Sequence, residues 1–355
     1  MGQKNKLRRW PYIACAIIAV IVAVAVVWRE PLRMVFYSVV DPTNQLDVSD
    51  PWAGGEVYRN VQYADVSETD YLNLYVPHAD APAPLIVLVH GGGFVLNDCE
   101  SRQAQLFYQY FRNHGWACAT VNYRLAQEAL FPAAVQDVKC AVRFLRANAE
   151  KYGYNADRIA IWGESAGGYL AVMASVTDED EFNDLPFIGE AALAEPVSAH
   201  IDALVDYYGA VQLESHADRA AAFRELGVPA FIVDLAAGWL KDPIKDMPWA
   251  RTCEDAWMGK PFDSMSDEEK RLVSPLYYAE VNLNPDSGLS ALIMHGDADI
   301  TVPWTQSKAL HGIMAEKLGA QRVTFELIRN AKHADEDMYS DATLSDVAKW
   351  LETGT

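Results

Sequence analysis

Basic side chains are scarce in this sequence. It has 29 lysines and arginines against 49 aspartates and glutamates, a formal net charge of −20 at pH 7. A nucleic-acid-binding surface needs clustered Lys and Arg to neutralise phosphates, so the deficit argues against a nucleic-acid partner. It also argues against docking of the main domain onto an anionic lipid surface. We expect the acidic side chains to form a solvated surface.

Cysteines are also few, with five in 355 residues. That number cannot build a fold from disulfides. Cys15 lies in an apolar N-terminal run, and Cys99, Cys118, Cys140 and Cys253 show no metal-binding spacing. Buried thiols and a disulfide both remain open for these four. The sequence predicts neither a metal nor a cofactor.

Charge is missing altogether from one stretch near the N-terminus. Pro11–Trp28 runs for 18 residues without a charged side chain, which is long enough to cross a bilayer. Residues 1–9 carry four basic side chains and no acidic one, and such a flank stays in the cytoplasm. We therefore expect residues 1–28 to anchor the chain in the cell membrane, with the remainder outside the cytoplasm. The alternative is a cleaved signal peptide and a secreted protein.

Apolar runs alternate with helical patterns along the rest of the chain. Residues 85–89 (LIVLV) and 158–162 (RIAIW) are typical of strands buried on both faces. Further strands are expected at Trp116–Val121, Asp202–Tyr208, Leu289–Met294 and Val323–Ile328, and helices at Pro132–Tyr152, Leu170–Ser175, Trp304–Leu318 and Leu344–Leu351. Tyr58–Val76 predicts two antiparallel edge strands. The alternation predicts an α/β fold with a mostly parallel central sheet covered by helices on both faces.

Two segments interrupt this alternation. Residues 29–56 are broken by Pro and Gly and predict a connector. About eighty residues separate the strand that ends near Gly209 from the next one, which is too long for a plain loop in a compact domain. We predict one domain at residues 57–355, with a small helical cap inserted at about 211–275. The aromatic residues of this insertion line either the substrate pocket or the cap's own core: Phe231, Trp239, Trp249, Trp257 and Phe262.

The segment Gly163-Glu164-Ser165-Ala166-Gly167-Gly168 follows a buried strand and opens a helix. In that context a G-x-S-x-G motif predicts a sharp turn that exposes a nucleophilic serine above the sheet. The small residues two before and two after the serine leave room for the turn. The helix N-terminus favours negative charge that develops near it. We predict Ser165 as the nucleophile.

A second glycine-rich segment, His90-Gly91-Gly92-Gly93-Phe94, comes directly after the strand at 85–89. Attack on an ester carbonyl creates an oxyanion, which needs preorganised N–H donors. Three glycines let the backbone approach a substrate closely. We predict the amides of Gly92, Gly93 and Ala166 as the oxyanion hole. His90 is expected to brace this loop rather than to act as the base.

The base and the acid are expected late in the chain, because the order in such folds is serine, acid, histidine. His333 follows the last predicted strand and is the best-placed base. The acid lies in the loop after the strand at 289–294, where Asp297 and Asp299 compete. The acid must hold the imidazole in the correct tautomer, and the residue pattern alone leaves the two open. His295 is expected to brace this loop.

These segments resemble the α/β-hydrolase superfamily, most closely its hormone-sensitive-lipase-like and feruloyl/acetyl-xylan esterase groups. The likeness spans roughly residues 57–352 and rests on the two glycine-rich segments, on Tyr123–Asp137, on Ser274–Tyr277 and on His295–Pro303. The H-G-x-x-D-x-x-V-P pattern of these relatives implies that Asp299, not Asp297, is the acid. Two departures stand out: the D-P-L-x-D-E segment of hormone-sensitive-lipase-like esterases is absent, and Ala334 follows His333 where glycine is common.

Together these features predict a serine carboxylesterase that acts through an acyl-enzyme on Ser165, without metal or cofactor. Its substrate is expected to be a small-molecule or glycan-linked ester. One alternative is an exported serine peptidase of the prolyl-oligopeptidase type, although no β-propeller repeat is present in the sequence. Another is a surface binding module that kept the fold and lost the chemistry. Nothing in the sequence predicts the oligomeric state.

Overall fold

The computed structural model describes residues 52–213, 252–299 and 301–353, together with the single residues 221, 247 and 250. All of them belong to the unit Asn44–Thr355. The expected membrane segment Pro11–Trp28 and most of the expected cap lie outside these residues. Within the described ranges, no helix is both long and apolar enough to span a bilayer.

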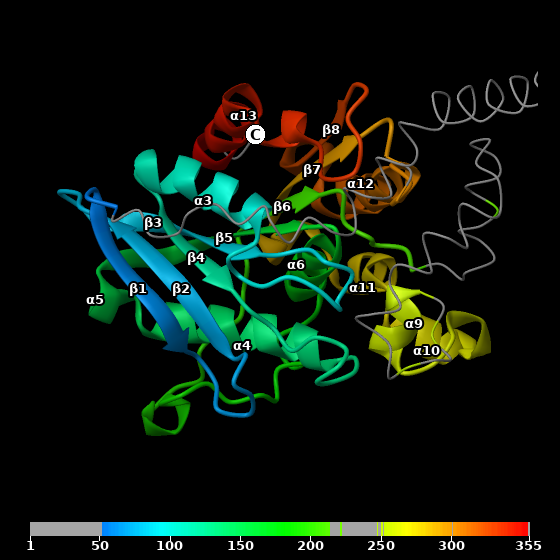
Figure 1. Cartoon of the computed structure of the whole chain (residues 1–355), viewed down its shortest axis with the longest axis horizontal. Helices are drawn as coiled ribbons and strands as arrows, with labels where there is room; N and C mark the ends of the chain where they lie inside the picture. Colours follow the sequence, from blue (N-terminus) through cyan, green and yellow to red (C-terminus); the bar gives the residue numbers. More distant parts are fainter. Residues whose placement is uncertain are drawn as a thin grey trace, which may run out of the picture. The chain divides into compact units, whose positions relative to one another are not determined.

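The described strands form one eight-stranded sheet in the order β1-β2-β4-β3-β5-β6-β7-β8 (Figure 1). Their bounds are β1 Gly55–Gln62, β2 Tyr71–Pro77, β3 Ala83–Val89, β4 Ala117–Val121, β5 Tyr154–Glu164, β6 Ala203–Tyr207, β7 Ser290–Gly296 and β8 Val323–Ile328. β1 pairs antiparallel with β2, and β2 with β4, whereas every other neighbouring pair is parallel. The predicted mostly parallel sheet with an antiparallel edge is confirmed.

Helices cover both faces of this sheet (Figure 1). The longer ones are α3 Arg102–Asn113, α4 Ala133–Ala147, α6 Ala166–Val176, α11 Pro275–Asn282, α12 Thr305–Leu318 and α13 Asp341–Thr353, and the short ones are α5 Ala149–Tyr152, α9 Cys253–Met258 and α10 Asp267–Leu272. The core under α4, α6 and α12 is separate from the core under α3 and α13. Successive side chains of a strand point to opposite faces, so each central strand contributes to both cores.

Strand β3 shows why the sequence needs a continuous apolar run. Leu85, Val87 and Val89 point into the first core, and Ile86 and Leu88 point into the second. All five side chains are buried. A polar residue at any of these positions would be buried without a partner on one face, which costs about 1–3 kcal/mol. The apolar pattern is therefore the pattern of a doubly covered strand.

The structure differs from the predicted elements in three places. β1 begins at Gly55, two residues inside the expected connector 29–56. The helix expected at 132–152 breaks at Asn148, whose side-chain amide donates to the Phe144 carbonyl at 2.8 Å and so ends α4. Helix α3 was not predicted at all. Ser101 caps it by accepting from the Ala104 amide, and its Phe107 ring stacks on Trp162 of β5 at 4.3 Å.

The carboxyl ends of the parallel strands meet along one edge of the sheet. In the register, Val89 of β3 pairs with Gly163 of β5, and Glu164 pairs with Tyr207 of β6. Further along, Gly296 of β7 pairs with Ile328 of β8. The loops that follow β3, β5, β7 and β8 therefore emerge side by side. These are the loops that carry every predicted site residue.

Candidate active site

Ser165 stands at a strained turn between β5 and α6. Its backbone φ is 51° and its ψ is −117°, a conformation that L residues rarely adopt. The turn is possible only because glycine stands on both sides of it. A Cβ on Gly163 would lie 2.2 Å from the Gly167 carbonyl oxygen, and one on Gly167 would lie 2.1 Å from the Val89 oxygen. Such strain costs about 1–3 kcal/mol and is found at sites where function requires it. The half-buried Ser165 can be reached from solvent.

His333 lies between Ser165 and Asp299. Its Nε2 is 3.0 Å from Ser165 Oγ, and its Nδ1 is 2.6 Å from Asp299 Oδ2. The three side chains come from the loops after β5, β7 and β8. The structure thus brings the predicted nucleophile, base and acid into one hydrogen-bonded chain.

Asp299 is buried but well satisfied. Its Oδ1 accepts from the amides of Thr301 at 2.7 Å and Val302 at 2.9 Å, and its Oδ2 lies 3.2 Å from His295 Nε2 as well as against His333. Burial raises the pKa of this carboxyl, but the two histidines outweigh burial and hold the pKa below its ordinary value of 3.8. An ionised carboxylate only accepts, so His333 carries its proton on Nδ1 and leaves Nε2 free to accept from Ser165.

Asp297 has a different role. Its side chain is exposed, and its Oδ1 accepts from the Asn330 amide at 2.6 Å. Its own amide donates to the Ile328 carbonyl at 3.1 Å. Asp297 therefore ties the loop after β7 to the end of β8. The structure places Asp299, not Asp297, against His333.

Gly92 and Gly93 lie in the loop after β3, with φ of 120° and 61°. A Cβ on Gly92 would lie 2.2 Å from the Leu96 oxygen, and one on Gly93 would lie 2.9 Å from Cys253 Sγ of α9. Only glycine fits these positions without displacing backbone or the thiol. Ala166 is the first residue of α6 and follows Ser165 directly. The three predicted oxyanion donors thus belong to the loop after β3 and to the start of α6.

His90 and His295 lie where braces are expected. His90 is buried, donates from Nδ1 to the Gly91 carbonyl at 2.8 Å and stacks on Tyr123 at 4.3 Å. Burial lowers its pKa to about 4, so the ring is neutral at physiological pH. His295 bridges Ser307 at 2.7 Å and the Val302 carbonyl at 2.8 Å. Both imidazole rings form hydrogen bonds that stabilise the loops carrying predicted site residues.

Three residues beside the triad were missed from the sequence: Glu164, Tyr208 and Tyr339. Glu164 is the middle residue of Gly163-Glu164-Ser165, and the carboxylate is buried against both tyrosine hydroxyls. The Tyr208 ring packs on the His333 imidazole, with ring centroids 4.7 Å apart. A charged residue inside an otherwise apolar strand end was the only sequence signal for this cluster.

Trp257 of the expected cap packs on the hydrolase core. Its ring stacks on Phe94 at 4.1 Å and meets Tyr169 and Phe131 edge-on. Phe94 follows Gly93, one of the predicted oxyanion donors, so aromatic contact holds α9 against the loop after β3, which is the predicted oxyanion loop. Phe262 is partly buried against the same core. Phe231, Trp239 and Trp249 lie outside the described residues.

The four described cysteines are free thiols. No group of three or more His, Cys, Asp or Glu side chains within it could hold a metal ion. Cys99, Cys118 and Cys140 are buried thiols, and burial raises the pKa of each well above its usual range. Cys253 is also buried, against the oxyanion loop.

Comparison with known proteins shows the family of the chain. A family model described as BD-FAE matches residues 72–314. The chain belongs to the BD-FAE family. Two curated relatives from Mycobacterium tuberculosis are similar to it. Esterase LipC is 34% identical over 36% of this chain and 30% of its own, and Esterase LipQ is 26% identical over 71% of this chain and 50% of its own. The chain thus spans half or less of these relatives.

Solved structures share the fold of this BD-FAE member. A truncated carbohydrate esterase from gut microbiota has a TM-score of 0.66 and is 23% identical, covering 86% of this chain and 98% of its own. The propionate-bound esterase Est2 from Thermogutta terrifontis has a TM-score of 0.57 and is 20% identical, covering 85% of this chain and 94% of its own. The resemblance to α/β-hydrolase esterases and the predicted α/β-hydrolase fold are confirmed.

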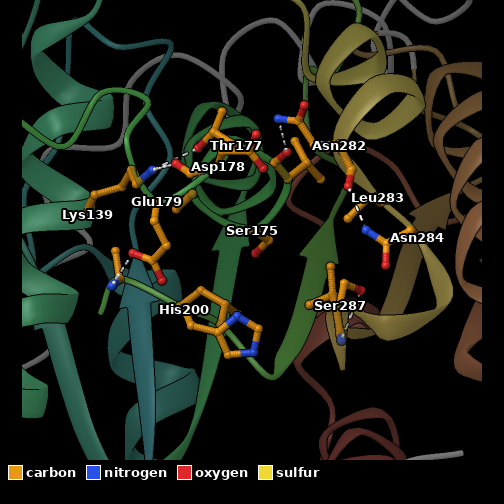
Figure 2. Close-up of a pocket in the computed structure, with 15 residues that line it drawn as sticks. Lys139, Ser175, Thr177, Asp178, Glu179, His200, Asn282, Leu283, Asn284 and Ser287 are labelled. Carbon is orange, nitrogen blue, oxygen red and sulfur yellow. Dashed lines mark hydrogen bonds between the residues drawn. The ribbon is translucent and has the colours of Figure 1, made fainter. Parts of the chain in front are cut away.

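A cavity of about 210 Å³ opens at the other end of α6 (Figure 2). The residues around it include Lys139, whose ammonium donates to Thr177 Oγ1 and to the Asp178 and Glu181 carbonyls at 3.2, 2.7 and 2.5 Å. The lysine thus binds the segment that follows α6. The length of α6 separates this cavity from Ser165 by roughly 16 Å at 1.5 Å per residue. None of the predicted site residues is among those that line it.

Asp206 is a buried carboxyl that the triad does not use. Its Oδ1 accepts from the Gly209 amide at 3.1 Å, whereas its Oδ2 has no hydrogen-bond partner among the described residues. Burial raises its pKa from 3.8 to about 7, and the Gly209 bond offsets only part of that. The folded protein therefore binds a proton at this site over a pH range in which the unfolded chain has lost it.

This difference in the pKa of Asp206 between the folded and the unfolded chain predicts that the folded protein loses stability as the pH rises. The favourable contribution of protonated Asp206 is complete below pH 4 and is lost as the pH rises through about 7. We expect Asp206→Asn to remove that loss, so the variant should exceed the wild type in stability at pH 8 by up to roughly 4 kcal/mol. Urea unfolding of both proteins at pH 5, 6.5 and 8 checks this. A stability difference that stays constant across the three values would contradict it.

Proposed function

We propose that this protein is a serine carboxylesterase that hydrolyses carboxylic esters through an acyl-enzyme on Ser165. The observation that carries the proposal is the pair of contacts made by His333. Its Nε2 lies 3.0 Å from Ser165 Oγ, and its Nδ1 lies 2.6 Å from Asp299 Oδ2. The glycine loop next to it supports the same chemistry. Membership of the BD-FAE family and the names of the similar esterases also support it.

In the proposed first step, His333 Nε2 takes the proton of Ser165 while Oγ attacks the ester carbonyl carbon. The carbonyl oxygen becomes an oxyanion and receives hydrogen bonds from the amides of Gly92, Gly93 and Ala166. The helix dipole of α6 favours the same charge, because Ala166 is its first residue. The C–O bond then breaks, and His333 returns the proton to the leaving alcohol.

Deacylation repeats the sequence with water as nucleophile. His333 accepts a proton from water, the hydroxide attacks the acyl carbon, and the proton returns to Ser165 Oγ as the carboxylic acid leaves. Asp299 stays ionised throughout and stabilises the imidazolium that forms in each half-reaction. Its depressed pKa supports that role.

The substrate is proposed to be a small-molecule or glycan-linked ester. One similar structure is that of a carbohydrate esterase, and another holds propionate. A panel of p-nitrophenyl esters from acetate to decanoate, together with acetylated xylan and feruloyl esters, tests the function. We expect steady turnover of at least one ester, and a burst of nitrophenol from those nitrophenyl esters whose deacylation is slower than their acylation.

A prolyl peptide p-nitroanilide separates the peptidase alternative from the esterase. Its cleavage by a protein that turns over no ester would replace the esterase with an exported serine peptidase. A folded protein that hydrolyses neither substrate would point to the binding-module alternative. The contacts of His333 with Ser165 and Asp299 argue against the binding module, but a serine peptidase would use the same three residues, so the two substrates decide between esterase and peptidase.

We also propose that Pro11–Trp28 anchors the protein in the cell membrane, with the hydrolase domain outside the cytoplasm. The basic flank and the uncharged run in the sequence support this. The protein should stay with membranes after a carbonate wash, and protease added to intact cells should degrade the domain. A protease-resistant enzyme in the cytoplasm would contradict export. A mature N-terminus near Val26 would instead support secretion after cleavage.

A further inference from the structure

Glu164, the residue before Ser165, is a buried carboxylate surrounded by donors. Its Oε1 accepts from the Gly91 amide at 3.1 Å. Its Oε2 accepts from the Tyr208 hydroxyl at 2.7 Å and from the Tyr339 hydroxyl at 2.9 Å. An unpaired buried charge would cost several kcal/mol, and these three donors offset that cost. The ester chemistry described above does not use this group.

Each donor comes from a different element of the site. Gly91 precedes Gly92 and Gly93 in the loop after β3, and a Cβ on Gly91 would lie 3.3 Å from Glu164 Oε1. Tyr208 follows the last residue of β6, and Tyr339 ends the 3-10 turn Glu336–Tyr339 shortly after His333. The carboxylate therefore connects the oxyanion loop with two segments beside the base. Its own chain position connects all of them to the nucleophile.

Tyr208 carries the connection to His333. Its ring meets the imidazole at a centroid distance of 4.7 Å and an angle of 60°. Its backbone amide donates to the Met294 carbonyl at 2.8 Å, which fixes the residue to β7. Burial, and then the charge of Glu164, raise the pKa of Tyr208 and of Tyr339 well above the usual value, so both remain hydroxyl donors.

We propose that Glu164 is a positioning residue of the reaction. It holds the oxyanion loop and the Tyr208 ring, which packs on His333, at fixed distances from Ser165. This inference rests on the proposed esterase function. Displacement of reacting groups by 1 Å can cost about 10² in rate, so a bond network that sets their spacing acts on kcat rather than on substrate binding. The Glu164 carboxylate thus sets the positions of the reacting groups and does not react itself.

Glu164→Gln tests this with little change of shape. The glutamine amide has one acceptor oxygen in place of two, so it cannot accept from Gly91 and from both tyrosines at once. We expect kcat for p-nitrophenyl acetate to fall about 10²-fold, while KM changes by less than about threefold. Tyr339→Phe removes one donor together with its contact to the Tyr208 hydroxyl, leaves Gly91 untouched, and should lower kcat by about tenfold. The double variant should lose little more than Glu164→Gln, because both changes break one network.

Tyr154→Phe is the matched control. The Tyr154 hydroxyl is equally buried and donates to the Leu145 carbonyl at 2.6 Å, but it lies at the amino end of β5. It should lower Tm without lowering kcat. The proposal is overturned if the Glu164 and Tyr339 variants keep wild-type kcat, or lose it only in proportion to Tm as the control does. If Glu164→Gln does not fold, Tyr339→Phe and Tyr208→Phe decide the matter by the same two measures.

The wild type separates this inference from the function beneath it. A folded wild-type protein that turns over no ester removes the proposed function. A wild type that hydrolyses esters, with position 164 and 339 variants that do so equally well, removes only the positioning role of Glu164.

Discussion

Ser165→Ala is expected to lower kcat for ester hydrolysis by roughly 10⁶-fold while the protein stays folded. The change removes the only atom that the mechanism bonds to the acyl group, and leaves the oxyanion donors and the bound substrate in place. Steady-state kinetics on the best p-nitrophenyl ester, with circular dichroism of the same sample, measure both effects. Retention of more than about 1% of wild-type kcat would exclude Ser165 as the nucleophile.

Two companion variants separate chemistry from structure. Ser175→Ala removes a serine at the other end of α6, whose hydroxyl donates to the Ala171 carbonyl at 2.8 Å, and should leave kcat unchanged. Ser165→Gly should be as inactive as Ser165→Ala but more stable by about 1 kcal/mol, because glycine tolerates φ of 51°. Equal stability of the two position-165 variants would contradict the strain assigned to this turn.

Asp299→Asn is expected to reduce kcat by roughly 10⁴-fold at pH 7. Asparagine can still accept from the amides of Thr301 and Val302, so the loop should keep its shape. Its side-chain NH₂ would then face His333 Nδ1. That arrangement favours the tautomer with the proton on Nε2, which can no longer accept from Ser165. The measurement is kcat at pH 7 for folded protein, confirmed by an unchanged Tm.

Asp297→Asn is the control for this variant. The side-chain carbonyl of the introduced asparagine can replace the carboxylate oxygen that accepts from the Asn330 amide, so we expect most of kcat to remain and Tm to fall by no more than a few degrees. Reversed effects of the two substitutions would make Asp297 the acid. If both variants stay active, the base has another partner, and Asp335 and Asp337 would be substituted next.

The central part of the site could be predicted because local sequence determines it. A strand, a strained serine between two glycines and a helix form one short contiguous unit, and His333 follows directly on the last strand. The choice between Asp297 and Asp299 could not be made from local pattern. It depends on which side chain of a tight loop turns toward His333, and the family resemblance supplied that answer.

The network around Glu164 could not be predicted because its partners are distant in the chain. Tyr208 and Tyr339 lie 44 and 175 residues away, and only the paired strands together with the 3-10 turn Glu336–Tyr339 bring them to one place. Helix α3 was missed for a related reason. Its apolar side chains face a core that the sequence does not reveal until the strands are paired.

The backbone conformation explains one departure from the family pattern, the alanine at position 334. Ala334, where related esterases often carry glycine, has φ of 55°. Only glycine adopts this conformation without strain, which accounts for the glycine preference after the base. The chain tolerates alanine at a modest cost in stability, and His333 still contacts both Ser165 and Asp299.

Fluorophosphonate labelling, located by peptide mass, tests the nucleophile most directly. The reagent bonds only to an activated serine, so it needs the base and the strained turn together as well as the serine itself. We predict one adduct per wild-type chain, on Ser165, and none on Ser165→Ala. An adduct on another residue, undiminished labelling of Ser165→Ala, or no adduct on the folded wild type would contradict the account.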